Sequence, residues 1–440
     1  MQKQRSYIEE FLPCDGGSYD VIVAGGGPAG IGAALGAAMN GAKTLLLENR
    51  AFFGGVAYVS HWMPLNRLML EGLSRGDVCD RFVQKIKSFG NAGSRKGIDS
   101  WVNGDGLNIH PDYLRIAAYE LMEETGCHYL LNSPVTGVQM EDGKIFAVIC
   151  DGKYGRKSYS AKVYVDATGD GDLAYYAGVP TQKGRESDGV FMPVTVGFVI
   201  ANVDEERLYA ALDKDYGSIV DQIKGASERG YATSIFYSFD KTTIPGQVSI
   251  NNGGQVDIGI VDATDLNHTN VSLRTGLQVA VDFVTIVREL KLPGLENCVL
   301  AGTGADLGIR ETRRIVGDYV MTLEDSQQGV EFEDIVARRY GTIDPGGLQE
   351  DKNYHGSIVG GHAYPYRCML PKNAEDLLVA GRCASLTHLG LTVGKSMGNM
   401  MGIGSSAGTA AAMAAKSGVT PRELDVKLLQ KRLMEMNVRL

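Results

Sequence analysis

Cysteine pairs of the kind that bind metals or form disulfide frameworks are missing from this chain of 440 residues. The seven cysteines are scattered, at positions 14, 79, 127, 150, 298, 368 and 383, with no Cys-x-x-Cys spacing. An odd number of isolated thiols predicts reduced cysteines in a cytoplasmic protein and no iron–sulfur or zinc centre. No signal peptide is expected, because the first twenty residues contain no continuous apolar core.

Positive charge and long runs of bulky hydrophobic residues are also scarce. The chain has 43 Lys and Arg against 52 Asp and Glu, a formal net charge of −9, whereas binding to nucleic-acid phosphates needs a basic face. Two stretches, 21–42 and 396–415, are uncharged, but they are rich in Gly, Ala and Ser. Membrane insertion favours bulkier side chains, so we expect two buried, tightly packed helices and neither a membrane span nor a nucleic-acid partner.

Glycine is abundant, with 57 residues, nearly twice its usual share. A strand is predicted over 19–24, followed by the turn Gly25-Gly26-Gly27-Pro28-Ala29-Gly30, a helix to residue 39 and a second strand over 42–47. Gly25 permits the tight turn, Gly27 lets backbone N–H groups approach a pyrophosphate, and Gly30 lets the helix pack on the strand. The pattern predicts a dinucleotide site at the helix N-terminus.

Glu48 closes the second strand, 23 residues after Gly25. A carboxylate there accepts hydrogen bonds from ribose hydroxyls and repels a 2′-phosphate, which leaves FAD or NAD. Gly54 and Gly55 form a second glycine pair that could approach the diphosphate, although a plain turn is the alternative. Further strands end in glycine-containing loops at 166–172 and 376–382.

With these segments the sequence resembles the FAD-dependent oxidoreductase family with the glutathione-reductase-type two-dinucleotide flavin fold. The matching segments are 25–30 with Glu48, 54–55, 166–172, Arg310-Glu311-Thr312-Arg313, 365–367, 377–382 and the last helix with Gly404 and Gly408. The resemblance implies FAD as the cofactor and an α/β fold, in which a discontinuous Rossmann-like FAD-binding domain carries an inserted α+β cap or substrate domain.

The resemblance also implies where the cofactor lies. Thr168 and Gly169 fall near the adenosine, Gly381 and Arg382 near the ribityl chain, and the last helix begins near Met397 beside the flavin. Arg382 stands where many relatives have an aspartate, and Lys395 stands where they often have an arginine. The expected cofactor-binding residues are Gly25, Gly27, Pro28, Ala29, Gly30, Glu48, Asn49, Arg50, Gly54, Gly55, Val135, Thr168, Gly169, Asp170, Gly381, Arg382, Met397, Gly398, Asn399 and Met400.

The expected domain boundaries follow changes in pattern along the chain. Residues 19–185 and 301–420 form the two parts of the FAD-binding domain, 186–300 the cap domain, and 421–440 a C-terminal helix. In the first part we expect a helix over 111–125, strands over 128–131, 135–140, 145–150 and 162–165, and a hairpin at Asp142-Gly143. In the cap we expect strands from 190–201, helices over 204–213, 218–228 and 271–290, and a hairpin at Asn252-Gly253.

Candidate catalytic residues fall in three segments. Arg310 or Arg313 is expected to bind a carboxylate or stabilise an enolate, with Glu311 fixing an arginine, and an interdomain salt-bridge network is the alternative. His355, His362 and Tyr364 are candidates for proton transfer, although a lone histidine is more often simply hydrogen-bonded in place. Lys395 completes the set.

The glycine-rich segment 301–308 imitates a second dinucleotide fingerprint, but the charged residues 310–314 follow it where a small-residue helix would be needed. Without a nicotinamide domain, the flavin exchanges electrons directly with small molecules or a carrier. We expect hydride transfer between flavin N5 and a small polar, anionic substrate, in a homo-oligomer. A flavin monooxygenase and a non-catalytic flavin-binding subunit are the alternatives, and the electron donor or acceptor stays open.

Overall fold

A parallel sheet forms the centre of the computed structural model, which describes residues 14–70, 73–90, 93–96, 107–251, 261–341, 343–344 and 361–440. Its parallel strands are β5 (His128–Leu130), β2 (Thr44–Leu47), β1 (Cys14–Ala24), β8 (Gly155–Asp166) and β17 (Leu377–Val379), side by side in that order. The residues near the carboxyl ends of four of these strands, 21–24, 45–47, 163–165 and 377–379, are apolar and buried, as expected where both faces of a sheet are covered.

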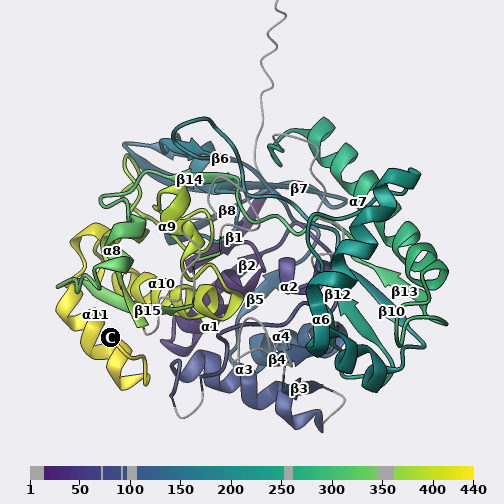
Figure 1. Ribbon diagram of the computed structural model, residues 1–440. Coiled ribbons are helices and arrows are strands. Elements are labelled where there is room, and N and C mark those ends of the chain that lie inside the picture. Colours follow the sequence, from purple (N-terminus) through teal and green to yellow (C-terminus); the bar gives the residue numbers. More distant parts are fainter. Residues whose placement is uncertain are drawn as a thin grey trace, which may run out of the picture.

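β8 pairs with two strands in parallel and with one antiparallel, the latter being β7 (Lys144–Gly152), which lies beside it in Figure 1. The last residues of β8, 164–166, pair in parallel with β17, whereas residues 155–159 pair antiparallel with β7. β7 pairs in turn with β6 (Val135–Glu141) through the predicted hairpin, in which Asp142 and Gly143 both have positive φ angles, 48° and 77°. Two such residues fit the tight turn that joins right-twisted strands, so the hairpin prediction is confirmed.

Alternate residues of the strands pack into different layers. Val21 and Val23 join a core with α1 (Pro28–Met39), α3 (Asp77–Ser88), α4 (Pro111–Glu124) and α10 (Met397–Ser417). Ile22 and Ala24 join a second core with the β6–β7 hairpin and α5 (Asp172–Tyr176). The sheet is therefore the middle of three layers.

The two uncharged stretches form helices that pack on each other. A Cβ atom on Gly404 of α10 would lie 2.0 Å from the carbonyl oxygen of Ala29, and one on Gly408 would lie 1.9 Å from that of Ala33. Only glycine allows so close an approach, which explains why these helices are rich in small residues. Among the described residues, none of the helices combines the length and the apolar character that crossing a bilayer requires.

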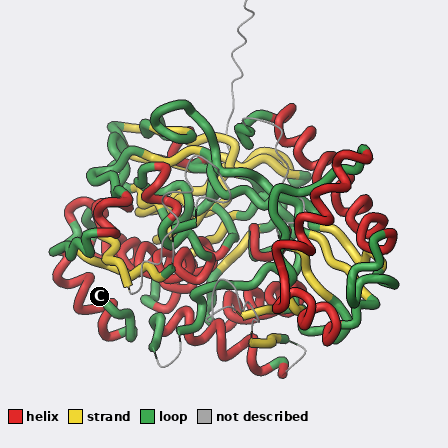
Figure 2. The backbone as a smooth tube through the Cα atoms, in the orientation of Figure 1, coloured by secondary structure: helices red, strands yellow, loops and turns green. Residues whose placement is uncertain are grey.

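A second, antiparallel sheet has its own hydrophobic core, on the right of Figures 1 and 2. Its order is β11 (Asp240–Lys241), β12 (Val248–Ile250), β10 (Phe198–Ala201) and β13 (Val299–Thr303). The helices α6 (Glu205–Gly225) and α7 (Leu266–Glu289) contribute to the same core.

The remaining elements are shorter. They are α2 (Val56–Val59), β3 (Ser94–Lys96), β4 (Leu107–Ile109), β9 (Thr181–Lys183), β14 (Arg313–Ile315), α8 (Leu323–Gln327), β15 (Ile335–Tyr340), β16 (Gly361–Pro365), α9 (His388–Thr392) and α11 (Val426–Glu435). The C-terminal helix expected over 421–440 is shorter than predicted: residues 426–435 form α11, whose Leu429 and Leu433 are buried in the main core, and 421–423 form a separate 3-10 turn.

One expectation for the second region needs correction, one is confirmed, and one lies outside the described residues. Only residues 198–201 of the expected strand region 190–201 form a regular strand. The helices expected over 204–213 and 218–228 are confirmed as the two halves of α6, which is broken between them at Asp215 (φ −160°, ψ 78°). The Asp215 side chain accepts a hydrogen bond from the N–H of Ser218 and so caps the second half. The expected Asn252-Gly253 hairpin falls outside the described residues.

Candidate functional site

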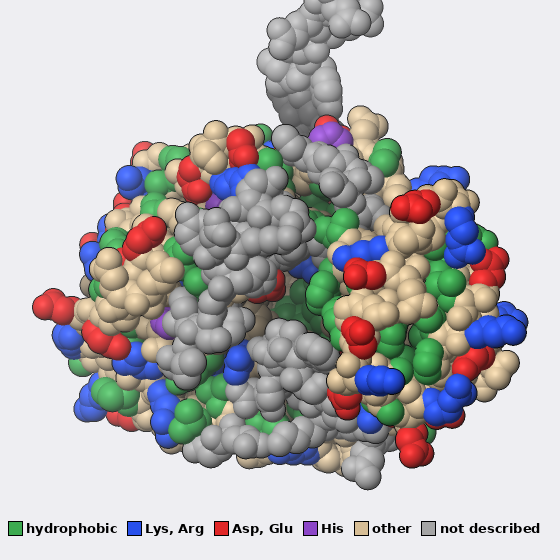
Figure 3. Space-filling model, viewed as in Figure 1, with side chains coloured by type: hydrophobic (Ala, Val, Ile, Leu, Met, Phe, Trp, Pro, Cys, Tyr) green, Lys and Arg blue, Asp and Glu red, His purple; other side chains and the backbone are tan. Residues whose placement is uncertain are grey.

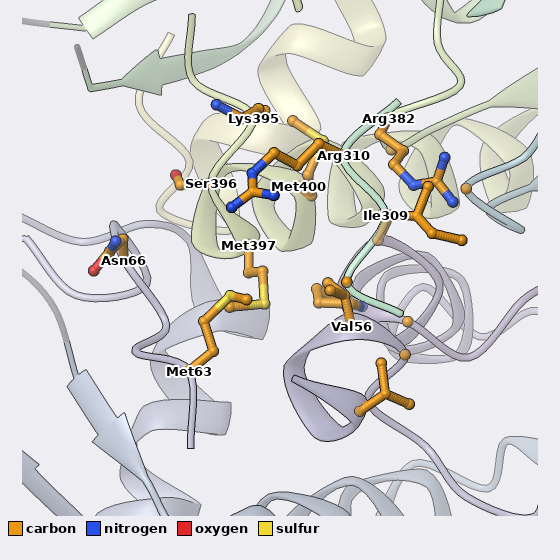
Figure 4. Close-up of a pocket in the computed structure, with 18 of the residues that line it drawn as sticks. Val56, Met63, Asn66, Ile309, Arg310, Arg382, Lys395, Ser396, Met397 and Met400 are labelled. Carbon is orange, nitrogen blue, oxygen red and sulfur yellow. The ribbon is translucent and has the colours of Figure 1, made fainter. Parts of the chain in front are cut away.

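A cavity of about 560 Å³ opens at the carboxyl ends of β1, β2, β8 and β17. This edge of a parallel sheet is where ligands bind in open α/β folds. The walls come from the glycine turn after β1, residues 47–50, the loop after β8, residues 381–382, the segment 307–310 and the start of α10. Figure 4 shows side chains from several of these segments facing the same space.

The glycine turn has the geometry that the sequence predicted. Gly25 has a φ of 101°, and a Cβ atom there would lie 2.4 Å from the carbonyl oxygen of Ala167. Gly27 lines the cavity, and a Cβ atom on Gly55 would lie 2.9 Å from the Cα of Gly27. Gly30 lies behind the cavity, where a Cβ atom would lie 1.7 Å from the carbonyl oxygen of Gly25. Bare backbone is thus presented to the cavity from two glycine segments.

Glu48 lies beside this turn, only 4% exposed. Its carboxylate accepts hydrogen bonds from the N–H of Gly26 at 2.5 Å and from the N–H of Arg50 at 2.7 Å. Burial raises the pKa of Glu48, and these N–H groups oppose that rise. Asn49, Arg50 and Val135 line the same end of the cavity.

The Arg382 guanidinium binds two side chains, and one of them belongs to the loop after β8. Its guanidinium donates to Asp170 Oδ1 at 2.5 Å and to Thr312 Oγ1 at 2.7 Å. Burial acts to raise the pKa of Asp170, but Arg382 and Thr312 outweigh it, so the pKa lies below its usual value. Thr168, Gly169, Asp170, Gly381 and Arg382 all line the cavity.

The charged residues predicted to act together around Arg310 do not all line the cavity. Arg310 lines the cavity, and its guanidinium donates to the carbonyl oxygen of Pro193 at 2.8 Å. Arg313 is not among the lining residues, and it pairs with Asp172 at 2.8 Å. Glu311 is 1% exposed and also lies away from the cavity.

Glu311 belongs to a buried polar network. Its carboxylate pairs with Arg314 and lies 2.8 Å from Nδ1 of His388, and it accepts from the N–H of Met192 at 3.0 Å. The side chains of Glu311, Arg314 and His388 are fully buried. The network joins three distant segments of the chain, which matches the salt-bridge alternative.

Lys395 lines the cavity with Arg310, and Figure 4 shows the two side chains on one side of it. The ammonium pairs with the Asp344 carboxylate at 2.6 Å. Burial lowers the pKa of Lys395, Asp344 opposes this, and Arg310 adds to the lowering. Two cations and the Asp344 carboxylate therefore line the same cavity.

The start of α10 contributes Ser396, Met397 and Met400 to the cavity. Gly398 and Asn399, which were also expected to bind the cofactor, do not line it. The N–H of Gly398 donates to the carbonyl oxygen of Asn66, and the Asn399 side chain bonds to Tyr340 and Arg75. They hold the beginning of the helix in place.

The proton-transfer candidates on β16 do not line the cavity either. His362 is 6% exposed, and burial lowers its pKa to about 4. Tyr364 is fully buried in the main core, where burial raises its pKa. His355 lies outside the described residues. Within the described ranges, no group of His, Cys, Asp and Glu side chains is placed to bind a metal.

Sequence reasoning missed one whole wall of the cavity. It comes from α6 and the segment after it, with Tyr209, Leu212, Tyr216, Phe236, Tyr237, Ser238 and Phe239. Tyr209 and Leu212 share one face of the first half of α6, at i and i+3, but the sequence does not distinguish a face that lines a cavity from one that packs in a core.

Comparison with known proteins gives one family match and several distant structural likenesses. The family model described as FAD dependent oxidoreductase matches residues 20–433. A geranylgeranyl bacteriochlorophyll reductase-like protein from Thermoplasma acidophilum is 16% identical, with 96% of this chain and 86% of that chain covered and a TM-score of 0.47. A p-nitrophenol 4-monooxygenase from Pseudomonas putida is 12% identical (95% and 84% covered, TM-score 0.48). A myxobacterial chondrochloren halogenase is 14% identical (96% and 79% covered, TM-score 0.48).

Proposed function

The chain belongs to the FAD-dependent oxidoreductase family, and from this premise we propose that it transfers a hydride between FAD and a small polar, anionic substrate. FAD is the cofactor, and when bound its flavin supplies two-electron redox chemistry at N5. The protein's part is to bind both molecules, orient them and keep water from the reacting atoms.

The residues of the cavity fit FAD. The bare backbone at Gly27 and Gly55 leaves room for a diphosphate at the N-terminus of α1. Glu48 supplies a buried acceptor for ribose hydroxyls at one end, with Asn49 and Val135 beside the adenosine. At the other end we assign Met397 and Met400 to the flavin, and the positive end of α10 favours a negatively charged flavin there.

The finer fold assignments are part of the same proposal. The β6–β7 hairpin on a parallel sheet supports the glutathione-reductase-type arrangement. The second sheet with α6 and α7 supports a cap or substrate domain, inserted at about residues 186–300 between two parts of the FAD-binding domain. β13 joins that sheet, so we place its end a few residues beyond 300.

The pair of cations on one wall is the observation that carries the substrate assignment. Arg310 and Lys395 both line the cavity near Met397 and Met400, and a carboxylate bound there would add charge-assisted hydrogen bonds to those that they already make with the carbonyl oxygen of Pro193 and with Asp344. We assign substrate binding to these two residues. To Glu311 and Arg313, which lie off the cavity, we assign a positioning role.

The Arg310→Ala variant tests this assignment. FAD should stay bound, as shown by the absorbance of the purified protein, whereas anaerobic reduction of the flavin by a panel of carboxylates, sugars and cyclic ketones should slow about 100-fold or more. Arg156→Ala is the control, because Arg156 forms an exposed pair with Asp151 at 2.7 Å. Unchanged reduction with a lower melting temperature would make Arg310 structural. Oxygen consumption with a hydroxylated product would favour a monooxygenase instead.

A further inference from the structure

We propose that the substrate carries an aromatic ring next to its anionic group, and that α6 and residues 236–239 select for that ring. The inference rests on the proposed function and extends it, because it assigns another wall of the same cavity. The substrate class is thus an aromatic carboxylate or a close analogue of one.

The wall is made of rings from two adjoining segments. Tyr209 and Leu212 line the cavity from the first half of α6, Tyr216 lines it from just after the break at Asp215, and Phe236 and Phe239 follow from the next segment. Phe236 is 39% exposed although it lines a cavity, whereas Phe239 is 8% exposed. Figure 3 shows a hollow near the middle of this face of the molecule, with hydrophobic side chains beside it. A partly exposed aromatic ring at a cavity offers apolar area for a ligand to cover.

The hydroxyl groups of this wall bond to the protein itself. The Tyr209 hydroxyl donates to the carbonyl oxygen of Phe239 at 3.2 Å, and the Tyr216 hydroxyl donates to the carbonyl oxygen of Tyr237. The Tyr237 hydroxyl accepts from the N–H of Ser234 at 2.8 Å. With these hydroxyls turned to backbone groups, the tyrosines contribute mainly the apolar surface of their rings.

The other polar groups of the wall are engaged in the same way. Ser238 donates to Asp240 Oδ2 at 3.3 Å, and the Asn251 amide donates to the same oxygen at 2.5 Å. A ligand that offered only polar groups would find few complementary atoms here, and burying them without partners is unfavourable. A flat apolar ring fits this wall, and its anionic group meets the wall that holds Arg310 and Lys395.

Three small molecules distinguish recognition of the aromatic ring from recognition of the negative charge. Benzoate has the ring and the charge, acetate has the charge alone, and benzyl alcohol has the ring alone. Their binding to the FAD-loaded protein would be measured by calorimetry and by changes in the flavin absorbance. We expect benzoate to bind at least about 10-fold more tightly than acetate and than benzyl alcohol.

Two variants test which wall of the cavity is responsible for the preference for benzoate. Phe236→Ala should reduce the benzoate-to-acetate ratio to less than about 3 while leaving acetate binding unchanged. Lys395→Met should weaken benzoate and acetate together by about 10-fold and leave their ratio unchanged. The control is Phe146→Ala, because Phe146 is a 56% exposed ring on β7, outside the cavity, and this variant should behave as the wild type.

Equal binding of acetate and benzoate by the wild type would overturn the inference. So would a Phe236→Ala variant with an unchanged ratio, or a Phe146→Ala variant with an equal loss. Flavin content is measured separately. A protein that takes up no FAD would overturn the proposed function, and the calorimetric ratio would still decide whether the ring is recognised.

Discussion

Glu48 shows how one buried carboxylate serves both the turn and the site. It accepts from two backbone N–H groups and also lines the cavity. We predict that Glu48→Gln weakens FAD binding about 10-fold, because a neutral amide is a poorer acceptor for a ribose hydroxyl than a carboxylate is. Titration of the apoprotein with FAD, followed by flavin fluorescence, measures this.

The control for Glu48 is Glu141→Gln, at an exposed position at the end of β6. It should bind FAD as the wild type does. If Glu48→Gln bound FAD with wild-type affinity, the adenosine would have to lie elsewhere in the cavity.

We predict that Glu311 stabilises the folded protein. Glu311→Gln removes the negative charge beside the fully buried Arg314 guanidinium, which should lower the free energy of unfolding by about 3–5 kcal/mol. Chemical denaturation measures this. Glu331→Gln is the control, since Glu331 pairs with Arg338 at the surface at 2.8 Å and its loss should cost about 1 kcal/mol or less. Wild-type stability with lost turnover in Glu311→Gln would instead indicate a catalytic role.

At single residues, sequence reasoning worked where chemistry is local. The positions of Gly25, Gly27 and Glu48 follow from a turn whose geometry is fixed within thirty residues. Glu311 and Tyr364 could not be placed in this way, because charge and hydrogen-bonding capacity look alike whether a side chain faces a cavity or a core. Whether such a side chain faces the cavity or the core depends on the packing of segments that lie far apart in the sequence.

At the scale of elements, the contact between α1 and α10 depends on glycine. We predict that Gly404→Ala lowers the free energy of unfolding by about 1–3 kcal/mol or more, because the new methyl group would meet the carbonyl oxygen of Ala29 at 2.0 Å. Gly225→Ala is a matched control, since no atom lies within 4 Å of a Cβ there and its φ is −59°. That change should be neutral or slightly stabilising.

Thermal unfolding of both variants tests the helix contact. An equal melting temperature for Gly404→Ala and the wild type would mean that the helices can separate without loss. The existence of these helices was predictable from small-residue composition, and the start of α10 near Met397 followed from the family resemblance. The break in α6 was expected as well, as the gap between helices over 204–213 and 218–228, and Asp215 makes it through its own backbone angles and then caps the next turn.

For the whole molecule, the pH dependence of stability should reflect a carboxyl group that links two parts of the main sheet. Asp376, just before β17, accepts from the N–H of Ile145 in β7 at 3.0 Å, and burial raises its pKa to about 6. Its unfolded pKa is about 3.9, so the folded protein binds the extra proton between these values. The resulting stability is full below about pH 4 and is lost as pH rises through 6.

We predict that Asp376→Asn removes this part of the pH dependence. Between pH 4.5 and 7.5, the stability of the wild type relative to the variant should fall by up to about 2–3 kcal/mol. Asp213→Asn, an exposed position on α6, is the control. Asp166, whose pKa burial also raises to about 6, titrates in both proteins and cancels. An unchanged pH profile in Asp376→Asn would assign the titration to other groups.

The sheet order could be predicted in part from the alternation of strands, glycine loops and helices. The joining of β17 to β8 needs partners more than two hundred residues apart, for which spacing gives no signal beyond the family resemblance. Homo-oligomer formation and a cytoplasmic location stay predictions.

The pairing of β8 with both β7 and β17 affects how the chain can fold during translation. On the ribosome, the carboxyl half of β8 and the glycine face of α1 are complete early, yet each waits for a neighbour that is translated only with residues 377–379 and 397–417. Maturation of the nascent chain is therefore expected to end late, with an apolar intermediate that chaperones must shield until the final segments arrive.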